Sequence, residues 1–182
     1  SVRSSSGFLV TPSGIPADQL DEGSMVELSL DGTLRGYGKP SSEWRLHAAI
    51  YSARVDAHAI IHAHPPFSTT IACLRQDIPP VHYMIAVTGG HRVRCSAYAT
   101  FGSAELSAAA VEALGESRAC LLANHGLVVV AASPAEAIEL TKLVERVACV
   151  MAGAERLGTP IPIPESVRGK FQSAYLARRR GA

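Results

Sequence analysis

Strand-like apolar runs alternate with segments of helical periodicity along the chain, and this alternation limits the possible folds more than any other feature. No internal repeat and no low-complexity segment interrupts the pattern. A chain of 182 residues is long enough for one compact domain with a sizeable buried core. We therefore expect a single α/β domain over residues 1–182, an α/β/α layered fold with a central mixed, largely antiparallel sheet.

Local signals set the expected bounds of the elements. Asp31-Gly32 is a turn pair typical of a β-hairpin, Ser41 or Ser42 is the expected N-cap of a helix, and Gly115 marks a helix end. Strands are expected at residues 7–12, 25–30, 33–38, 57–64, 81–87, 92–97 and, with a break at 124–126, 119–132. Helices are expected at residues 40–55, 65–74, 102–115 and 134–158, before a proline-rich tail at 159–182.

The charge balance bears on the partners of the chain. A formal net charge of +1 gives no electrostatic reason to expect nucleic acid or an acidic membrane as partner. Charged residues make up 18% of the chain, against about 25% in typical soluble domains. We therefore expect a small-molecule ligand and a surface that is partly buried against other subunits.

The cysteines and the apolar runs bear on the compartment. Cys73, Cys95, Cys120 and Cys149 are widely spaced and form no Cys-x-x-Cys pair, which predicts buried free thiols in a reducing cytoplasm. No apolar run approaches the roughly 20 residues needed to span a bilayer. The first residues lack the apolar core of a signal peptide and an initiator methionine, so we expect a cytoplasmic protein whose chain is trimmed.

Two histidines interrupt an apolar strand in the segment IIHAHPPF. Side chains two residues apart on a strand share one face, so His62 and His64 can reach a single ion. The alternative is that both rings serve packing or hydrogen bonding. His125 is a third candidate, because it lies where a buried strand breaks before Gly126. Three imidazoles with an open position are typical of a catalytic zinc site, whereas structural zinc sites are closed by four protein ligands.

The remaining histidines have simpler interpretations. His47, His58 and His91 fall at a helix, a turn and a loop, where we expect them at the surface or supporting other groups. His82 lies within an apolar strand-like run and is expected to be a hydrogen-bonded core histidine.

A second group of residues suits an anion. Ser13 and Gly14 form a turn after a strand, and Ser41 and Ser42 stand at a helix N-terminus, where free N–H groups and the helix dipole favour phosphate. Either helix serine could equally be only a cap. Glu43 could likewise be only a helix-start acid, but beside a metal and a phosphate it becomes a candidate ligand and base.

The chain resembles the class II aldolase/adducin family in a series of ordered segments. These segments are LVTPSGIP, GKPSSEWRLH, IIHAHPPFSTT, IPPVHYMIAVTGG, YATFGSAEL and LLANHGL. The resemblance implies a Zn2+-dependent enzyme, with Mn2+ or Co2+ as alternatives, that cleaves a ketose 1-phosphate to dihydroxyacetone phosphate and an aldehyde. L-Fuculose 1-phosphate and 5-deoxy or 5-methylthio pentulose 1-phosphates are the implied substrates. A homotetramer with active sites between subunits is implied as well.

The resemblance also implies a role for individual residues. The implied metal ligands are His62, His64 and His125, and Glu43 is implied to alternate between metal ligation and proton transfer. The implied phosphate-binding residues are Ser13, Gly14, Ser41 and Ser42. Tyr83 is implied to transfer a proton in a neighbouring subunit, and Phe101 is implied to form a wall beside the aldehyde. Tyr175 is implied to belong to the C-terminal tail.

The chain departs from the family pattern at its start, and other activities are alternatives to aldol cleavage. The family normally begins with a helix and a Gly-Asn loop that contacts phosphate, and this chain starts after that point, so phosphate affinity is expected to be lower. Sugar-phosphate epimerases, decarboxylases and adducin-like scaffolds without metal histidines belong to the same family. A lysine imine is a further alternative chemistry, for which the chain offers Lys39, Lys142 and Lys170.

Overall fold

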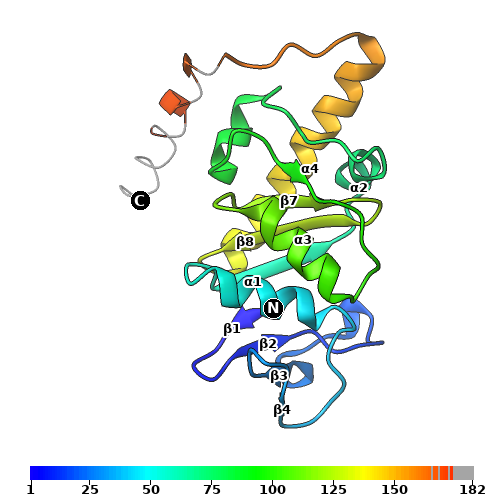
Figure 1. Ribbon diagram of the computed structural model, residues 1–182, viewed down its shortest axis with the longest axis vertical. Helices are drawn as coiled ribbons and strands as arrows, with labels where there is room; N and C mark the ends of the chain where they lie inside the picture. Colours follow the sequence, from blue (N-terminus) through cyan, green and yellow to red (C-terminus); the bar gives the residue numbers. More distant parts are fainter. Residues whose placement is uncertain (165, 168, 172, 174–182) are drawn as a thin grey trace.

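The computed structural model describes residues 1–164, 166–167, 169–171 and 173, and in that part of the chain it contains one sheet of eight strands (Figure 1). The strands are β1 (Val2–Arg3), β2 (Phe8–Val10), β3 (Val26–Leu28), β4 (Leu34–Arg35), β5 (Ala59–Ala63), β6 (Arg94–Cys95), β7 (Ala119–Leu122) and β8 (Gly126–Ala131). Their spatial order is β4-β3-β2-β1-β5-β8-β7-β6. Neighbouring strands are antiparallel, except that β6 and β7 run parallel, which confirms the expected mixed, largely antiparallel sheet.

Helices cover both faces of this sheet (Figure 1). They are α1 (Trp44–Ala53), α2 (Pro66–Cys73), α3 (Ala104–Leu114) and α4 (Pro134–Leu157), with short 3₁₀ helices η1 (Ala17–Gln19), η2 (Glu22–Ser24) and η3 (Tyr83–Thr88). One apolar core lies between the sheet and the pair α1 and α3, and a second lies between the sheet and the pair α2 and α4. Every residue of β8 is buried, as expected for a strand covered on both faces.

The start of α1 differs from the prediction. Neither Ser41 nor Ser42 is the N-cap, because Glu43 occupies that position and makes no side-chain capping bond. Ser41 instead closes a turn just before the helix, where its hydroxyl accepts a hydrogen bond from the Glu43 N–H at 3.3 Å and its carbonyl accepts one from the Trp44 N–H at 3.1 Å. The Glu43 carboxylate is therefore free to point away from the helix backbone.

Residues 81–87 do not form the predicted strand. They enter η3, whose residues Ile85 and Val87 pack into the core beside α4. His82 is the N-cap of η3 and its Nδ1 accepts a hydrogen bond from the Met84 N–H at 3.3 Å, so it is a half-buried capping residue and not a core histidine. The segment ends at Gly89, which has the positive φ of 79° that glycine tolerates.

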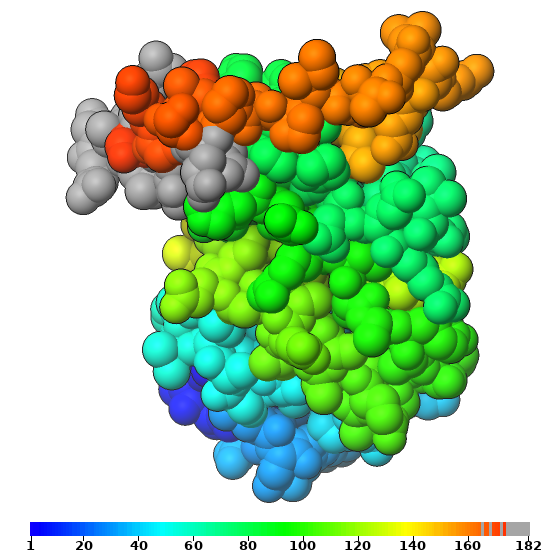
Figure 2. Space-filling view, turned by 45° about the horizontal axis from the view of Figure 1, so that its top comes forward, coloured from blue at the N-terminus to red at the C-terminus, as the bar shows by residue number. Residues whose placement is uncertain are grey.

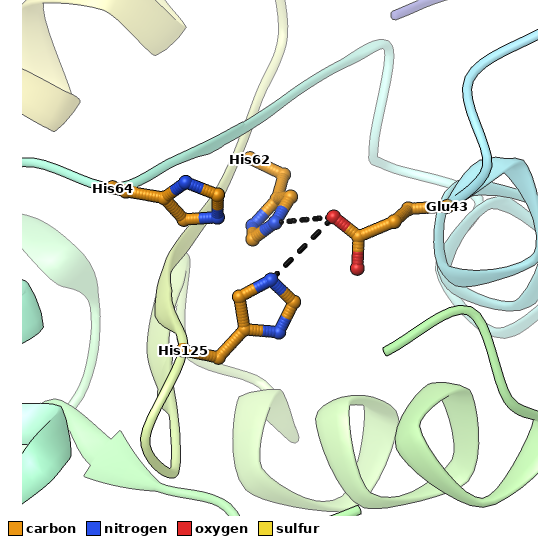
Figure 3. A group of neighbouring side chains, drawn as sticks. All are labelled: Glu43, His62, His64 and His125. Atoms are coloured by element: carbon orange, nitrogen blue, oxygen red, sulfur yellow. Dashed lines mark ion pairs between the residues drawn. The ribbon is translucent and has the colours of Figure 1, made fainter. Parts of the chain in front are cut away.

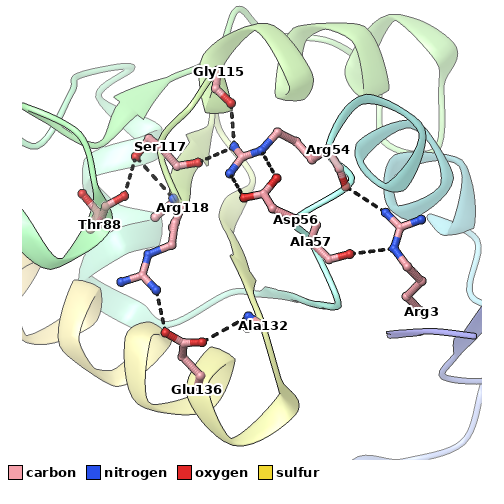
Figure 4. A network of polar contacts seen from close by, with 11 residues as sticks. Arg3, Arg54, Asp56, Ala57, Thr88, Gly115, Ser117, Arg118, Ala132 and Glu136 are labelled. Atoms are coloured by element: carbon pink, nitrogen blue, oxygen red, sulfur yellow. Dashed lines mark hydrogen bonds and ion pairs between the residues drawn. The ribbon is translucent and has the colours of Figure 1, made fainter. Parts of the chain in front are cut away.

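Arginine side chains join loops to the ends of helices (Figure 4). Arg54 at the end of α1 donates hydrogen bonds to the carbonyls of Gly115 and Ser117 at 2.6 and 2.9 Å. Arg118 pairs with Glu136 of α4 at 2.6 Å. These bonds satisfy backbone carbonyls beyond α3 and connect the two helical layers.

Several smaller expectations are corrected by the structure. All four cysteines are free, as predicted, but Cys73 and Cys149 are exposed. Of the two positions expected for His47, the structure shows the supporting one, because the residue is buried within α1 and its Nδ1 lies 2.7 Å from the Ser1 hydroxyl, whereas His58 is exposed. Among the described residues, no helix combines the length and the apolar character needed to cross a membrane.

The hairpin turn between β3 and β4 packs against the ring of Trp44, the residue that follows Glu43. Gly32 has φ of 86°, and a Cβ added there would lie 2.1 Å from the ring of Trp44. We expect Gly32→Ala to lower the free energy of unfolding by about 3 kcal/mol, because backbone strain and overpacking add. Gly89→Ala is the matched control, since Gly89 has a similar φ of 79° but open space around a Cβ. Urea unfolding measures both, and equal losses would show that the Trp44 contact contributes nothing.

Candidate metal centre

Four side chains converge from separate parts of the chain (Figure 3). Glu43 lies at the start of α1, His62 in β5, His64 just beyond the end of β5, and His125 in the turn between β7 and β8. One potential ligand atom from each of the four lies within 4.8 Å of the others. The structure thus brings together all four residues that the sequence marked as candidate ligands.

The sheet explains this convergence. Ile60 packs into the core beside α1 and α3, and Ile61 packs against the opposite core, so His62 points to the α1 side. β5 pairs antiparallel with β8, which carries the turn containing His125 to the end of β5. The ring centroids of His62 and His64 are 5.0 Å apart, those of His62 and His125 4.8 Å, and those of His64 and His125 5.0 Å.

The hydrogen bonds of His62 orient its ring toward the centre of the cluster. Its Nδ1 lies 3.0 Å from the carbonyl oxygen of Leu127. Because a carbonyl only accepts, this contact places a proton on Nδ1, and Nε2 is the nitrogen directed at the cluster. The same arrangement, a histidine that donates to a carbonyl from the nitrogen opposite the ligand atom, is usual for histidine metal ligands.

Two buried polar atoms in the cluster have no hydrogen-bond partner. Nε2 of His62 lies 2.9 Å from Oε2 of Glu43, and Nε2 of His125 lies 3.5 Å from the same oxygen. Nevertheless, His62 Nε2 and the other carboxylate oxygen, Glu43 Oε1, are both buried without a hydrogen bond of acceptable geometry. Such unpaired buried atoms are uncommon and costly. A cation among the four side chains would satisfy them, so the residues fit a metal ion.

The surroundings of Glu43 and His64 favour the protonation states of metal ligands. Burial tends to raise the pKa of Glu43, but interactions with the neighbouring rings of His125 and His62 outweigh burial and hold the pKa below its ordinary value. Burial, together with the neighbouring His62 and His125, lowers the pKa of His64. An ionised carboxylate and neutral imidazoles are the forms that bind a cation. Three nitrogen donors with one oxygen donor suit a first-row divalent metal.

The two predicted phosphate-binding turns lie side by side. The Ser13 N–H donates to the Lys39 carbonyl at 2.8 Å, and the Ser41 N–H donates to the Thr11 carbonyl at 3.0 Å. Gly14 has φ of 82°, and a Cβ added there would meet no atom within 4 Å, so its backbone faces open space. The turn with Ser13 and Gly14 therefore borders the turn that leads through Ser41 and Ser42 to Glu43.

The remaining predicted site residues are Phe101, Tyr83 and Tyr175. Phe101 is 67% exposed, and a Cβ at the following Gly102 would lie 3.2 Å from the Ser42 carbonyl oxygen, so its loop adjoins the serine turn. Tyr83 is 48% exposed in η3, which packs with α4 on the opposite face of the sheet from Glu43. Within one chain the structure does not bring Tyr83 to the four-residue cluster. Tyr175 lies outside the described residues.

Gly126 is a site residue that the sequence interpretation missed. A Cβ at this position would lie 2.6 Å from the His64 ring and 2.6 Å from the Ala63 carbonyl oxygen. Only glycine therefore allows the end of β5 and the start of β8 to approach closely enough for His64 and His125 to meet. The sequence signal was the glycine immediately after His125, which indicated a break in the strand but not this close approach.

Comparisons with known proteins show the family to which the chain belongs. The family model "Class II Aldolase and Adducin N-terminal domain" matches residues 1–152. A 5-methylthioribulose-1-phosphate/5-deoxyribulose-1-phosphate aldolase of Rhodospirillum rubrum is 47% identical over 148 residues, which cover 81% of this chain and 67% of that protein. The L-fuculose phosphate aldolase of Escherichia coli strain K12 is 39% identical over 163 residues, covering 90% of this chain and 76% of that protein.

A solved structure is also similar to this chain over most of its length. An L-fuculose 1-phosphate aldolase superposes with a TM-score of 0.88 at 38% identity, covering 92% of this chain and 79% of that chain. The matched family model extends over far more than half of the residues. The chain belongs to the class II aldolase and adducin family.

Proposed function

We propose that this protein is a metal-dependent aldolase that cleaves a ketose 1-phosphate to dihydroxyacetone phosphate and an aldehyde. The observation that carries the proposal is the cluster of Glu43, His62, His64 and His125, whose potential ligand atoms lie within 4.8 Å of one another. The relatives named as aldolases support the same activity. An adducin-like scaffold needs no such cluster, so the cluster favours the enzyme.

Zn2+ is the metal we assign to this site, with Mn2+ or Co2+ as substitutes. His62, His64 and His125 would hold it, and Glu43 would complete the set when no substrate is bound. Three imidazoles with an exchangeable position are typical of catalytic zinc. A divalent cation there would supply the positive charge that draws off the electron pair released when the C3–C4 bond of the substrate breaks.

Proton transfers fall to Glu43 and Tyr83. In the cleavage direction the hydroxyl of C4 loses its proton and C3 gains one. Glu43 Oε1 is buried and has no hydrogen-bond partner, so the carboxylate, ionised in the resting site, would take up a proton from solvent and deliver it from this oxygen to C3. Tyr83 lies on the opposite face of the sheet from the cluster of its own chain and is about half exposed, which suits a tyrosine that accepts the C4 proton in the site of a neighbouring subunit while its own phenolic proton passes to solvent.

The substrate phosphate is assigned to the adjoining turns with Ser13, Gly14, Ser41 and Ser42. Backbone N–H groups near the start of α1 and the hydroxyls of these turns are suitable donors to a phosphate. Glu43 follows this turn directly, so a bound phosphate fixes the distance between the anchored end of the substrate and the reacting carbons. Phe101 lies in the loop beside Ser42, where we place the wall next to the aldehyde. Tyr175 keeps the place in the C-terminal tail that the family resemblance implies.

A lysine imine is disfavoured by the surroundings of the lysines. Lys142 is exposed and pairs with Glu139 at 2.8 Å, and Lys39 is exposed as well. Lys170 is exposed in the segment after α4. A lysine that forms an imine needs a desolvated amine, and none of these three has one.

The assembly we propose is a homotetramer in the cytoplasm with active sites between subunits. Tyr83 needs a neighbouring chain to reach a metal cluster. A groove of about 500 Å³ between η3 and α4 offers a surface for such a neighbour, with apolar residues such as Leu140 and Val150 beside charged ones such as Glu139 and Arg146. The segment after α4, drawn orange in Figure 2, lies across this end of the molecule, where the Ile163 N–H donates to the Pro80 carbonyl at 2.8 Å.

Four free thiols suit the reducing compartment, the cytoplasm, that we propose for this protein.

A product assay on a panel of ketose 1-phosphates tests the activity. The panel contains L-fuculose 1-phosphate, 5-deoxyribulose 1-phosphate and 5-methylthioribulose 1-phosphate, with isomers inverted at C4. We expect release of dihydroxyacetone phosphate from at least one of them, measured by coupled oxidation of NADH. An epimerase would instead return a ketose phosphate of changed stereochemistry and a decarboxylase would release CO2, so either product without dihydroxyacetone phosphate would contradict the proposal.

A further inference from the structure

Helix α2 begins two residues after His64, and its first turn is tied to α4. The N-cap is Pro65, which has no side-chain acceptor for the free N–H groups of the helix. Glu145 of α4 supplies the acceptors: Oε1 accepts the Phe67 N–H at 2.8 Å, and Oε2 accepts the Ser68 N–H at 2.8 Å and the Ser68 hydroxyl at 2.7 Å. A carboxylate is favoured at a helix N-terminus. The segment directly after His64 is therefore fixed.

The other end of α2 is tied to the turn that carries His125. The Asn124 N–H donates to the Ala72 carbonyl at 2.9 Å, and Asn124 Oδ1 accepts a hydrogen bond from Arg75 Nε at 2.8 Å. Asn124 Nδ2 donates to the Cys73 carbonyl at 3.4 Å. Arg75 and Asn124 both have positive φ, 54° and 56°, a conformation that asparagine tolerates better than most residues.

These contacts connect the two candidate ligands that lie outside the strands. His62 is held within β5 by strand pairing, but His64 follows the strand and His125 belongs to a turn. We propose that α2 is a brace that sets the spacing of His64 and His125, with Glu145 and Asn124 as the positioning residues at its two ends. Neither residue belongs to the four-residue cluster; each acts through the backbone beside a ligand. This inference rests on the metal site proposed above.

Metal affinity of the full-length protein tests the brace. Zn2+ is titrated into metal-free parent and variants by calorimetry, and the visible spectrum of bound Co2+ reports ligand geometry. Asn124→Gly keeps the positive φ but removes the side-chain bonds, and Glu145→Gln removes an acceptor at the start of α2. We expect both to weaken metal binding about 10-fold, as loss of groups that orient ligands typically does, and to change the Co2+ spectrum.

Two further variants separate positioning from general loosening. Asn124→Asp keeps the Oδ1 acceptor for Arg75 and tolerates the positive φ but loses the 3.4 Å bond from Nδ2 to the Cys73 carbonyl, so it should bind metal more tightly than Asn124→Gly. Ser133→Ala removes the hydroxyl that caps α4 by accepting the Glu136 N–H at 3.2 Å, and it should lower stability while metal affinity stays unchanged.

The possible outcomes distinguish the brace from the proposed function. If the parent binds metal and Asn124→Gly and Glu145→Gln bind it equally well, the brace is wrong while the metal site stands. The brace is also wrong if Ser133→Ala weakens metal binding as strongly as Glu145→Gln, or if Asn124→Asp behaves like Asn124→Gly. A parent protein that binds no metal would overturn the proposed function itself.

Discussion

Removal of divalent metal should abolish the release of dihydroxyacetone phosphate by this protein. We expect dialysis against a chelator to reduce the rate by about three orders of magnitude, because a Lewis-acid cation contributes several kcal/mol of transition-state stabilisation. The buried, unpaired Nε2 of His62 and Oε1 of Glu43 are the structural reason for expecting that the active site is built around a cation. The measurement is the initial rate of the coupled assay before and after chelation.

Restoration of activity distinguishes metal loss from damage to the fold. Addition of Zn2+, Mn2+ or Co2+ to the chelated protein should recover the rate, and circular dichroism should show the same helical content with and without metal. His125→Ala provides a second comparison: it should stay inactive when metal is added back, because it removes one nitrogen donor from the cluster. Full activity of the chelated protein would exclude a catalytic metal.

Glu43→Gln should lower turnover by about 10²- to 10⁴-fold, the usual range for loss of a general acid or base. The amide has nearly the shape of the carboxylate but cannot deliver a proton to C3. We expect the variant still to bind metal through its three histidines, and still to bind inorganic phosphate at the serine turns. Turnover is measured at saturating ketose 1-phosphate, with metal content determined in parallel.

Glu105→Gln is the matched control for this substitution. Glu105 also lies in the first turn of a helix, α3, but it is exposed and outside the cluster. It therefore reproduces the loss of a negative charge near a helix N-terminus without touching the candidate site. Normal turnover is expected for Glu105→Gln, and normal turnover of Glu43→Gln as well would remove Glu43 from the mechanism.

The strand that carries the first two histidines could be predicted from local pattern alone. Alternation along β5 places His62 on the same side as Ile60, and His64 continues in that direction because the chain stays extended up to Pro65. The convergence of His125 on them could not follow from spacing, because it depends on the pairing of β5 with β8. The strand break before Gly126 marked His125 as a third candidate, the resemblance implied a ligand role for it, and the pairing of the strands gives the physical reason why it lies near His62 and His64.

Local sequence patterns did not predict the structure correctly where tertiary contacts determine it. The run VHYMIAV has strand-like composition, yet Ile85 and Val87 of η3 are buried beside α4, and strand propensity depends strongly on such context. The capping of α2 by Glu145 could not be predicted from local sequence, because Glu145 and Ser68 are 77 residues apart. The exposure of Tyr83 became evident only with the structure, and its action in a neighbouring subunit stays a prediction.

The most direct measurement of the central claim is anomalous X-ray scattering from crystals of the zinc-loaded protein. Diffraction recorded on both sides of the zinc absorption edge locates the ion independently of any assumption about its ligands. We predict one peak per chain, within bonding distance of ring nitrogens of His62, His64 and His125. Loaded protein whose peak lies elsewhere, or whose three imidazoles surround no peak, would contradict the account.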